Sequence, residues 1–292
     1  MERTGPGLAP PSGRMQISPL VINGVLYTTA GNQRSVVAIE AATGEPLWDW
    51  RPGDNERRWG DIIEPVARSA GRGVSYWNDG AGDERIFVVT PSYQLVALDA
   101  TTGRPVAEFG TDGIVDLKQH NDQLIDPLTG EIGWNSAPIV ARDVVIVGAS
   151  HRSGGSPPSR ENVKGYIRGF DVRTGELRWT FHTVPQAGEF GNDAWENDSW
   201  TYTGNTNVWT IMSADLELGY VYLPIGTPTN DWYGGHRLGD NLFAESLVCL
   251  DAATGERVWH FQMVHHDIWN YDTPTAPVLM DVTVDGRQIK GD

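Results

Sequence analysis

The chain has 292 residues, 39% of them hydrophobic, so it can bury a sizeable core as one large domain or two ordinary ones. Its formal net charge of −16 argues against nucleic acid and anionic membrane surfaces as partners. Cys249 is the lone cysteine, which excludes a disulfide within the chain, and no apolar run reaches the roughly 18 residues that span a bilayer.

Residues 1–13 are rich in proline and glycine and contain no apolar stretch. We therefore expect a flexible N-terminal segment and no signal peptide. Such a start fits a cytoplasmic protein, or a protein whose true N-terminus precedes this chain. The repeats described below favour the second interpretation.

Short alternating apolar runs, broken by turns, follow in chain order. Residues 19–28 turn at Asn23-Gly24, a pair that suits the φ > 0 positions of a tight hairpin. Similar strand pairs or strands lie at residues 85–90, 138–147 and 219–224. No amphipathic helix of about ten residues or more separates them, so the sequence predicts an all-β fold.

One sequence unit occurs four times: VAIEAATGEPLW from Val37, VALDATTGRPVA from Val96, IRGFDVRTGELRW from Ile167 and LVCLDAATGERVW from Leu247. Each unit predicts a β-hairpin in which an apolar strand ends in Asp or Glu and a Thr-Gly turn leads into the next strand. Three units carry a Trp four residues after the Gly, where its ring would pack against the neighbouring unit. Ala107 takes that place in the second unit, so its contact should be weaker.

Repetition on this scale is typical of propellers, in which each unit forms a radial four-stranded blade. Uneven spacing of the units predicts long loops, and such loops build the functional site on one face. We therefore interpret residues 1–292 as one partial β-propeller domain of about four blades. A complete four-bladed propeller is the alternative.

The segment that stands out chemically is HHDIWNYD, residues 265–272. Its two imidazoles, two carboxylates and two further aromatic rings are too polar for the core of a strand. One interpretation is a capped loop in which Asp267 accepts hydrogen bonds from turn amides and Trp269 covers the edge of a blade. The other is a functional site.

The repeat pattern A-x-D-x-x-T-G-x-x-x-W resembles the tryptophan-docking motif of the pyrroloquinoline-quinone (PQQ) dehydrogenases, which are eight-bladed propellers. The resemblance covers essentially the whole chain. Residues 265–272 are similar to the H-D-x-W-D-x-D stretch of the membrane-type glucose dehydrogenases. This likeness implies that Asp267 is the general base for the substrate hydroxyl and also approaches a calcium ion, with His266 beside it as a cofactor contact.

A second match, GNTNVW, resembles a family strand that lies beneath the quinone. It implies that Thr206 and Asn207 are polar contacts of the cofactor and that Trp209 is its aromatic floor. The register leaves Val208 as the alternative position for that floor.

A third match, residues 72–76, implies that Arg72 lies beside the carboxylates of the quinone. The cysteine pair that precedes this Arg in methanol and ethanol dehydrogenases is absent from residues 68–71, which indicates the glucose and quinate branch. Thr227 stands where relatives have a calcium-binding Asn, and residues 148–153 contain no carboxylate where relatives have a Glu. The family therefore implies calcium, while the sequence weakens that inference.

Together these resemblances imply a periplasmic oxidoreductase that passes hydride from a sugar or alcohol hydroxyl to PQQ, with a quinone or a cytochrome as electron acceptor. A second hypothesis is a cofactor-free propeller that acts as a scaffold, as in outer-membrane protein assembly. A third is an inactive fragment, because the family supplies a further Lys or Arg to the quinone from the blade after the aspartate loop.

Overall fold

A computed structural model describes residues 16–31, 34–52, 71–126, 130, 132–133, 137–149 and 159–291. The expectations for residues 1–13, 68–70 and 150–153 lie outside this part of the chain. Within it, helix is limited to two short 3-10 turns, η1 (Asn192–Ala194) and η2 (Glu196–Thr201). No helix of the described ranges is long and apolar enough to cross a membrane.

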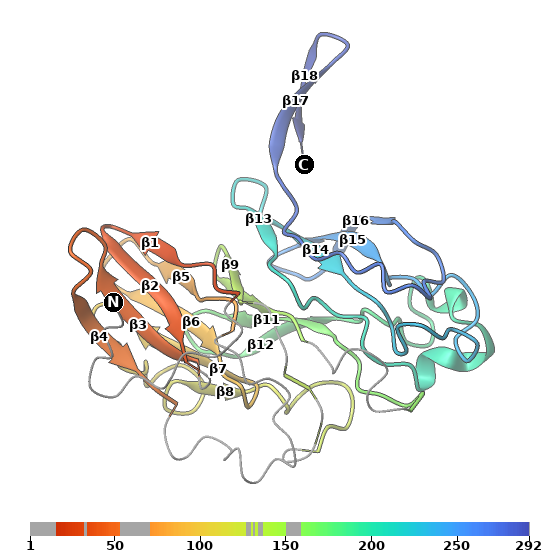
Figure 1. The fold of residues 1–292 in the computed structure, drawn as a ribbon, viewed down its shortest axis with the longest axis horizontal. Helices are drawn as coiled ribbons and strands as arrows, with labels where there is room; N and C mark the ends of the chain where they lie inside the picture. The colour runs from red at the N-terminus through yellow and green to blue at the C-terminus, as the bar shows by residue number, and fades with distance from the viewer. Residues whose placement is uncertain are drawn as a thin grey trace.

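Four antiparallel four-stranded sheets follow one another along the chain, and each contains one copy of the predicted repeat (Figure 1). Every strand pairs with its neighbours in sequence, which is the meander of a propeller blade. The all-β prediction is thus confirmed. The strands are β1 (Leu20–Ile22), β2 (Val25–Ala30), β3 (Ser35–Glu40), β4 (Pro46–Trp50), β5 (Ser75–Asn78), β6 (Glu84–Val89), β7 (Gln94–Asp99), β8 (Ile114–Asp116), β9 (Ile139–Ala141), β10 (Val144–Val147), β11 (Ile167–Asp171), β12 (Leu177–Phe181), β13 (Ser213–Asp215), β14 (Tyr220–Ile225), β15 (Ser246–Asp251) and β16 (Arg257–Gln262).

The repeated turn has the predicted chemistry. Asp99 Oδ1 accepts hydrogen bonds from the amides of Thr101 at 3.1 Å and Thr102 at 2.7 Å. Asp171 and Asp251 accept equivalent bonds in the later blades. These bonds satisfy the turn amides, so the two strands on either side stay in register.

The docking tryptophans join successive blades. Trp48 of the first blade donates a hydrogen bond from Nε1 to the carbonyl of Ala100 in the second, at 3.0 Å. Trp179 of the third blade makes the same 3.0 Å bond to the carbonyl of Ala252 in the fourth. The predicted inter-unit contact is confirmed in both places.

The second blade, which has Ala107 in the docking position, uses other side chains. Phe109 and Val115 lie against Gly175 of the third blade. The amide of Gly110 also donates to the carbonyl of Thr174 at 2.8 Å. The contact expected from Trp is therefore replaced by a pair of smaller apolar groups.

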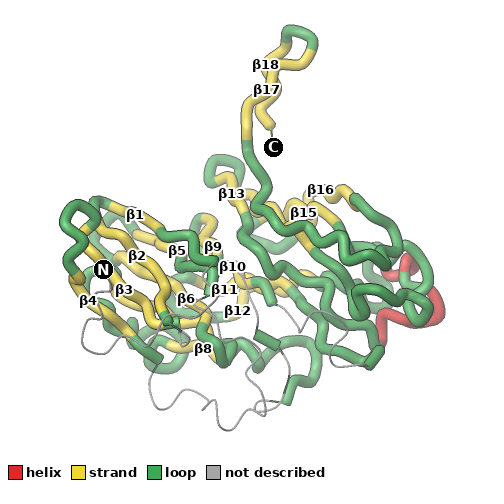
Figure 2. Tube along the Cα trace, in the orientation of Figure 1, coloured by secondary structure: helices red, strands yellow, loops and turns green. Residues whose placement is uncertain are grey.

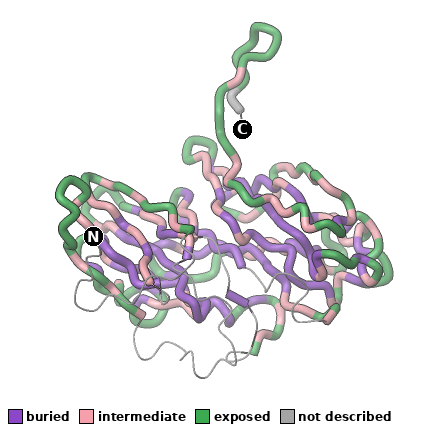
Figure 3. The backbone as a smooth tube through the Cα atoms, in the orientation of Figure 1, coloured by how far each residue is buried: buried purple, intermediate pink, exposed green. Residues whose placement is uncertain are grey.

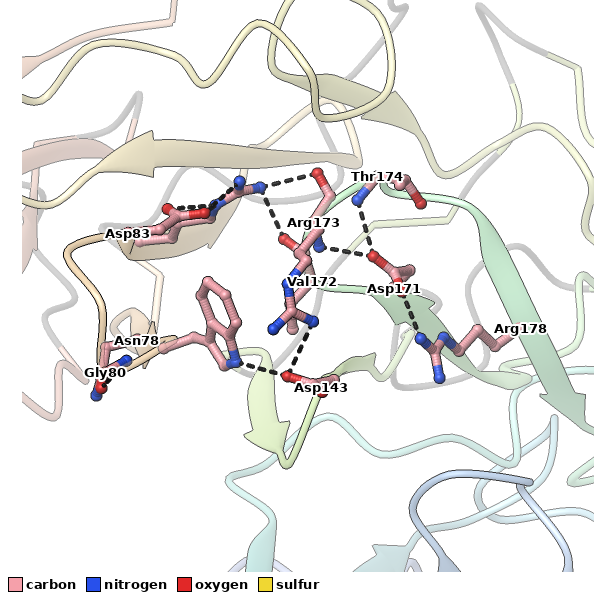
Figure 4. A network of polar contacts seen from close by, with 11 residues as sticks. Asn78, Gly80, Asp83, Asp143, Asp171, Val172, Arg173, Thr174 and Arg178 are labelled. Carbon is pink, nitrogen blue, oxygen red and sulfur yellow. Dashed lines mark hydrogen bonds and ion pairs between the residues drawn. The ribbon is translucent and has the colours of Figure 1, made fainter.

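Polar contacts add to the interface between the second and third blades (Figure 4). Trp77 Nε1 donates to Asp143 Oδ1 at 3.1 Å, and Arg173 pairs with the same carboxylate at 3.1 Å. Arg85 donates to the carbonyl of Arg173 at 2.8 Å. The hydrophobic core lies within and between the blades, where the buried strands contact one another (Figure 3).

The chain ends in a hairpin, β17 (Met280–Val284) and β18 (Arg287–Gly291), whose strands pair with each other and with no other described strand. It extends away from the four sheets (Figure 2). The segment before it is fastened to the fourth blade, because Thr273 donates to the carbonyl of Ile225 at 2.9 Å and Ser213 donates to that of Pro277 at 2.5 Å.

Candidate functional site

Asp267 is buried at the centre of the loop that follows β16, with 2% of its surface exposed. Its Oδ1 accepts a hydrogen bond from the amide of Trp269, and its Oδ2 accepts one from the amide of Tyr271, both at 3.0 Å. The amide bonds of the capped-loop interpretation are therefore present. Trp269 is 72% exposed, so the described residues cover little of its ring.

Arg237 holds the Asp267 loop to the loop between β14 and β15. It is fully buried, and its Nη2 donates to the carbonyl of Asp267 at 2.6 Å and to that of Asn230 at 3.0 Å. Its Nη1 donates to Asn241 Oδ1 at 2.7 Å. Burial lowers the pKa of Arg237 to about 10, although the Asp267, Asp231 and Glu245 carboxylates act in the opposite direction. Sequence reasoning missed this residue, which lies in a polar Gly-rich segment without a distinguishing motif.

Thr227, just after β14, connects three carboxylates. Its hydroxyl donates to Glu245 Oε1 at 2.5 Å and lies 3.4 Å from Asp267 Oδ2. Its amide donates to Asp272 Oδ1 at 3.0 Å. The structure thus brings together the two residues that the sequence predicted as metal ligands, Thr227 and Asp267.

Glu245 is the second residue that sequence reasoning missed. It is fully buried immediately before β15, and its Oε2 has no hydrogen-bond partner among the described residues. Burial raises its pKa to about 8; the hydrogen bond from Thr227 opposes this shift, while the charges of Asp272 and Asp267 add to it. A single acid in the run FAESLVCL, which is apolar apart from Ser246, was the available signal.

The GNTNVW segment is not a strand, which corrects the prediction. Its β-pairing in the described chain consists of isolated bridges from Asn205 to Lys164 and to Pro228. The amide of Thr206 donates to the carbonyl of Thr227 at 3.1 Å, so this segment lies directly beside the end of β14. Thr206 has φ 51, and a β-branched residue in the left-handed region is strained, as residues at functional sites often are.

The two side chains after Thr206 differ in their surroundings. Asn207 is buried; its amide group donates to Asn205, and its Oδ1 lacks a partner in the described part of the chain. Val208 is fully buried in the core between the third and fourth blades. Trp209 is half-buried, so its ring is the one at the surface of this segment.

Arg72, which precedes β5, lies over the Trp209 ring with its guanidinium carbon 4.9 Å from the ring centroid. Burial lowers its pKa, and no carboxylate of the described residues forms an ion pair with it. Gly226 leaves room for the Trp209 ring beside the Asp272 carboxylate. A Cβ there would lie 3.3 Å from Trp209 Nε1 and 2.4 Å from Asp272 Oδ1.

His266 is placed against a neighbouring loop. Its Nδ1 lies 2.9 Å from the carbonyl of Gly239, and its Nε2 would lie 2.7 Å from a Cβ on Gly234. These contacts fasten the Asp267 loop and do not reach the Trp209 ring. Over the ranges that the structure describes, no three His, Cys, Asp or Glu side chains converge as a metal site by themselves.

The resulting site extends from Arg72 and Trp209, past Thr206 and Thr227, to Asp267. It combines an arginine stacked on an aromatic ring, a strained polar segment and a buried carboxylate fixed by backbone amides. Its residues lie before β5, between β12 and β13, after β14 and after β16, so the site depends on how the second and fourth blades are placed in the arc.

A PQQ family model described as "Glucose/ethanol/alcohol dehydrogenase, beta-propeller domain" matches residues 3–291. The quinoprotein glucose dehydrogenase of Escherichia coli (strain K12) is 32% identical over 286 residues, which are 94% of this chain and 34% of that protein. The dehydrogenase subunit of the alcohol dehydrogenase (quinone) of Komagataeibacter europaeus is 32% identical over 289 residues, covering 92% of this chain and 36% of the relative.

Among solved structures, the quinohemoprotein alcohol dehydrogenase ADHIIG from Pseudomonas putida HK5 superposes with a TM-score of 0.74 and 28% identity. The match covers 97% of this chain and 40% of that one. The chain thus spans about a third of the length of the curated relatives it matches.

Proposed function

The chain belongs to the PQQ-dependent glucose/ethanol/alcohol dehydrogenase β-propeller family, and on that premise we propose that it supplies the PQQ site and the catalytic base of an oxidoreductase acting on a sugar or alcohol hydroxyl. The observation that carries this proposal is Asp267, a carboxylate that is 2% exposed and held by two backbone amides in a loop next to a stacked Arg and Trp. The relatives named above are dehydrogenases, which favours an enzyme over the scaffold hypothesis.

The residues around Trp209 fit a flat, anionic quinone. An aromatic ring offers a stacking surface, and a guanidinium is suited to a carboxylate. Arg72 is desolvated and lacks an ion-pair partner in the described chain, so an anionic ligand would relieve the cost of its burial. Thr206 would contribute polar contacts, as would Asn207 Oδ1, which lacks a hydrogen-bond partner among the described residues.

Bound PQQ would supply the two-electron oxidant that accepts hydride from the substrate carbon. Asp267 would take the proton of the hydroxyl on that carbon, so that the alcohol leaves as a carbonyl compound. Its two amide hydrogen bonds fix the carboxylate orientation, and Arg237 fixes the backbone of the same residue. A base that is already oriented needs less reorganisation when the substrate binds.

We further propose that Asp267 and Thr227 contribute to a calcium site, and that the electron acceptor is a quinone or a cytochrome in the periplasm. The oxygen donors of these two residues are of the type that calcium prefers. The absence of an alcohol-branch cysteine pair between residues 68 and 71 supports a sugar or polyol as the substrate.

The test is titration of PQQ into the chain, followed by absorbance, for the wild type, Asp267→Asn and Asp281→Asn. In a protein extended to the length of the relatives, we expect Asp267→Asn to keep PQQ binding and to lose about 10²–10⁴-fold of dye-linked glucose oxidation. Asp281 is exposed on the C-terminal hairpin and serves as the matched control. An extended protein that binds no PQQ would contradict the proposal.

A further inference from the structure

Glu245 is a buried carboxylate without a role in the function proposed so far. It is fully buried, and only one of its two oxygens has a hydrogen-bond partner within the described residues, the Thr227 hydroxyl at 2.5 Å. Burying a carboxylate with an unsatisfied oxygen is costly, and the few cases that occur call for an explanation. Ordinary packing does not provide one here, since a neutral side chain would fill the same space.

The surroundings of Glu245 carry an excess of negative charge. Asp267 and Asp272 both act on it electrostatically in the same direction, and Arg237 is the guanidinium that opposes them. Two carboxylates and one guanidinium thus act on Glu245, and the hydrogen bonds of that guanidinium go to backbone and amide oxygens. A divalent cation has the charge that would balance this group.

The Thr227 hydroxyl connects the oxygens that such a cation would need. It lies 2.5 Å from Glu245 Oε1 and 3.4 Å from Asp267 Oδ2. Carboxylates and a hydroxyl are hard oxygen donors, the type that suits calcium and magnesium.

We propose that Glu245 is a ligand of the divalent cation at this site and supplies the carboxylate that residues 148–149 lack. This inference rests on the proposed function, because the described side chains do not form a complete coordination shell by themselves and a bound anionic quinone would provide further oxygens. The cation is of the calcium type, and the protein's share of its shell is Glu245, Asp267 and the Thr227 hydroxyl.

The decisive variant is Glu245→Gln. Gln keeps the size of the side chain and can still accept the Thr227 hydrogen bond, but it has no charge and binds a cation weakly. If Glu245 were only a neutral, protonated group in the core, Gln would replace it without effect on metal binding. Glu256→Gln, at an exposed turn position, is the matched control.

The measurement is isothermal titration calorimetry with CaCl₂ and, separately, MgCl₂, on the 292-residue chain with and without saturating PQQ. We expect one calcium to bind the wild type, Glu245→Gln to weaken binding at least about tenfold, and Glu256→Gln to leave it within about twofold. Far-UV circular dichroism checks that each variant is folded. Should Glu245→Gln unfold, Thr227→Val provides the second route, and it too is expected to weaken calcium binding.

Equal calcium affinity in the wild type and Glu245→Gln would overturn the inference, as would no calcium binding to the wild type up to about 10 mM with PQQ present. The two proposals fail separately. If PQQ binds and Glu245→Gln leaves calcium affinity unchanged, Glu245 is not a calcium ligand and the proposed function stands. If PQQ does not bind at all, the proposed function fails, and the calcium titration without PQQ still tests Glu245.

Discussion

Trp48 occupies the space that a side chain on Gly103 would need. A Cβ at position 103 would lie 2.4 Å from Cε3 of the indole, far inside van der Waals contact. Gly44 holds the same turn position one blade earlier, also with positive φ, and has no atom within 4 Å of its Cβ position. The two glycines thus share a backbone conformation and differ in the docked ring.

We expect Gly103→Ala to lower the free energy of unfolding by about 2–4 kcal/mol, since it combines backbone strain with a steric clash. Gly44→Ala carries the backbone strain alone, so its cost should be about 1–2 kcal/mol. Urea denaturation followed by circular dichroism measures both. An equal decrease in the free energy of unfolding in the two variants would show that a side chain at position 103 does not disturb the docked Trp48 ring.

The sequence predicted the blades well because their signals are local. Asp99, the Thr-Gly turn and the alternating strands around it lie within one short segment, and each residue type has a physical reason for its place. The use of Phe109 and Val115 in place of a docking Trp could not be predicted, because it depends on how the second blade meets Gly175 of the third.

The candidate site was predicted only where it has a sequence motif. Asp267 and Thr227 were expected near each other, and the structure places their side chains 3.4 Å apart. Arg237 and Glu245 reach the same cluster from a loop and a strand end without any recognisable spacing. Their roles become visible only when burial and unpaired atoms are known, and one-dimensional patterns do not contain that information.

Arg237→Lys should destabilise the chain. The lysine keeps the charge, but it cannot reproduce the forked bonds to the Asp267 and Asn230 carbonyls and to Asn241. Some of these buried oxygen acceptors would then lack a hydrogen bond, so we expect the free energy of unfolding to fall by about 2–4 kcal/mol. Thermal and urea unfolding provide the measurement, with Arg104→Lys at an exposed turn as control. A stability equal to that of the wild type would show that the fork is dispensable.

Lys164 predicts a dependence of stability on pH. Burial lowers its pKa from 10.5 to about 8 in the folded chain. Below about pH 8 the amine is charged in both states; between about 8 and 10.5 the unfolded chain holds the proton and the folded chain releases it. Because the unfolded state then binds more protons, the contribution of Lys164 to stability rises with pH across this window, by up to about 3 kcal/mol.

The comparison that isolates this effect is wild type against Lys164→Met in urea titrations at pH 7.5, 9 and 10, values chosen to bracket the folded-state pKa of about 8. The stability difference between the two should move in favour of the wild type as the pH rises. Lys164→Arg, which stays charged throughout, should show no such gain. A difference that is constant with pH would contradict the prediction.

Arg72→Met tests two effects of the buried guanidinium, namely its effect on the stability of the cofactor-free chain and its effect on PQQ affinity. Met keeps the apolar stem over Trp209 and removes the desolvated guanidinium, whose pKa burial lowers. We therefore expect the cofactor-free chain to be as stable as the wild type or slightly more stable, while PQQ affinity falls at least about tenfold. Thermal unfolding without PQQ and absorbance titration with PQQ give the two quantities. Unchanged affinity would remove Arg72 from the proposed cofactor site.

The β17–β18 hairpin should unfold independently of the four sheets, so the chain does not unfold as one cooperative unit. Its backbone pairs, such as Val282 with Ile289, link only its own two strands, and an isolated two-stranded ribbon has marginal stability in water. Its amides should exchange with solvent deuterium through a local opening, without disturbing the four sheets. Amides of buried residues in strand β15, such as that of Val248, should exchange only when a blade opens. Amides of the chain should therefore exchange by two routes, local opening in the hairpin and opening of a blade in the sheets. The change from one route to the other is expected after residues 273–277, which are hydrogen-bonded to the fourth blade.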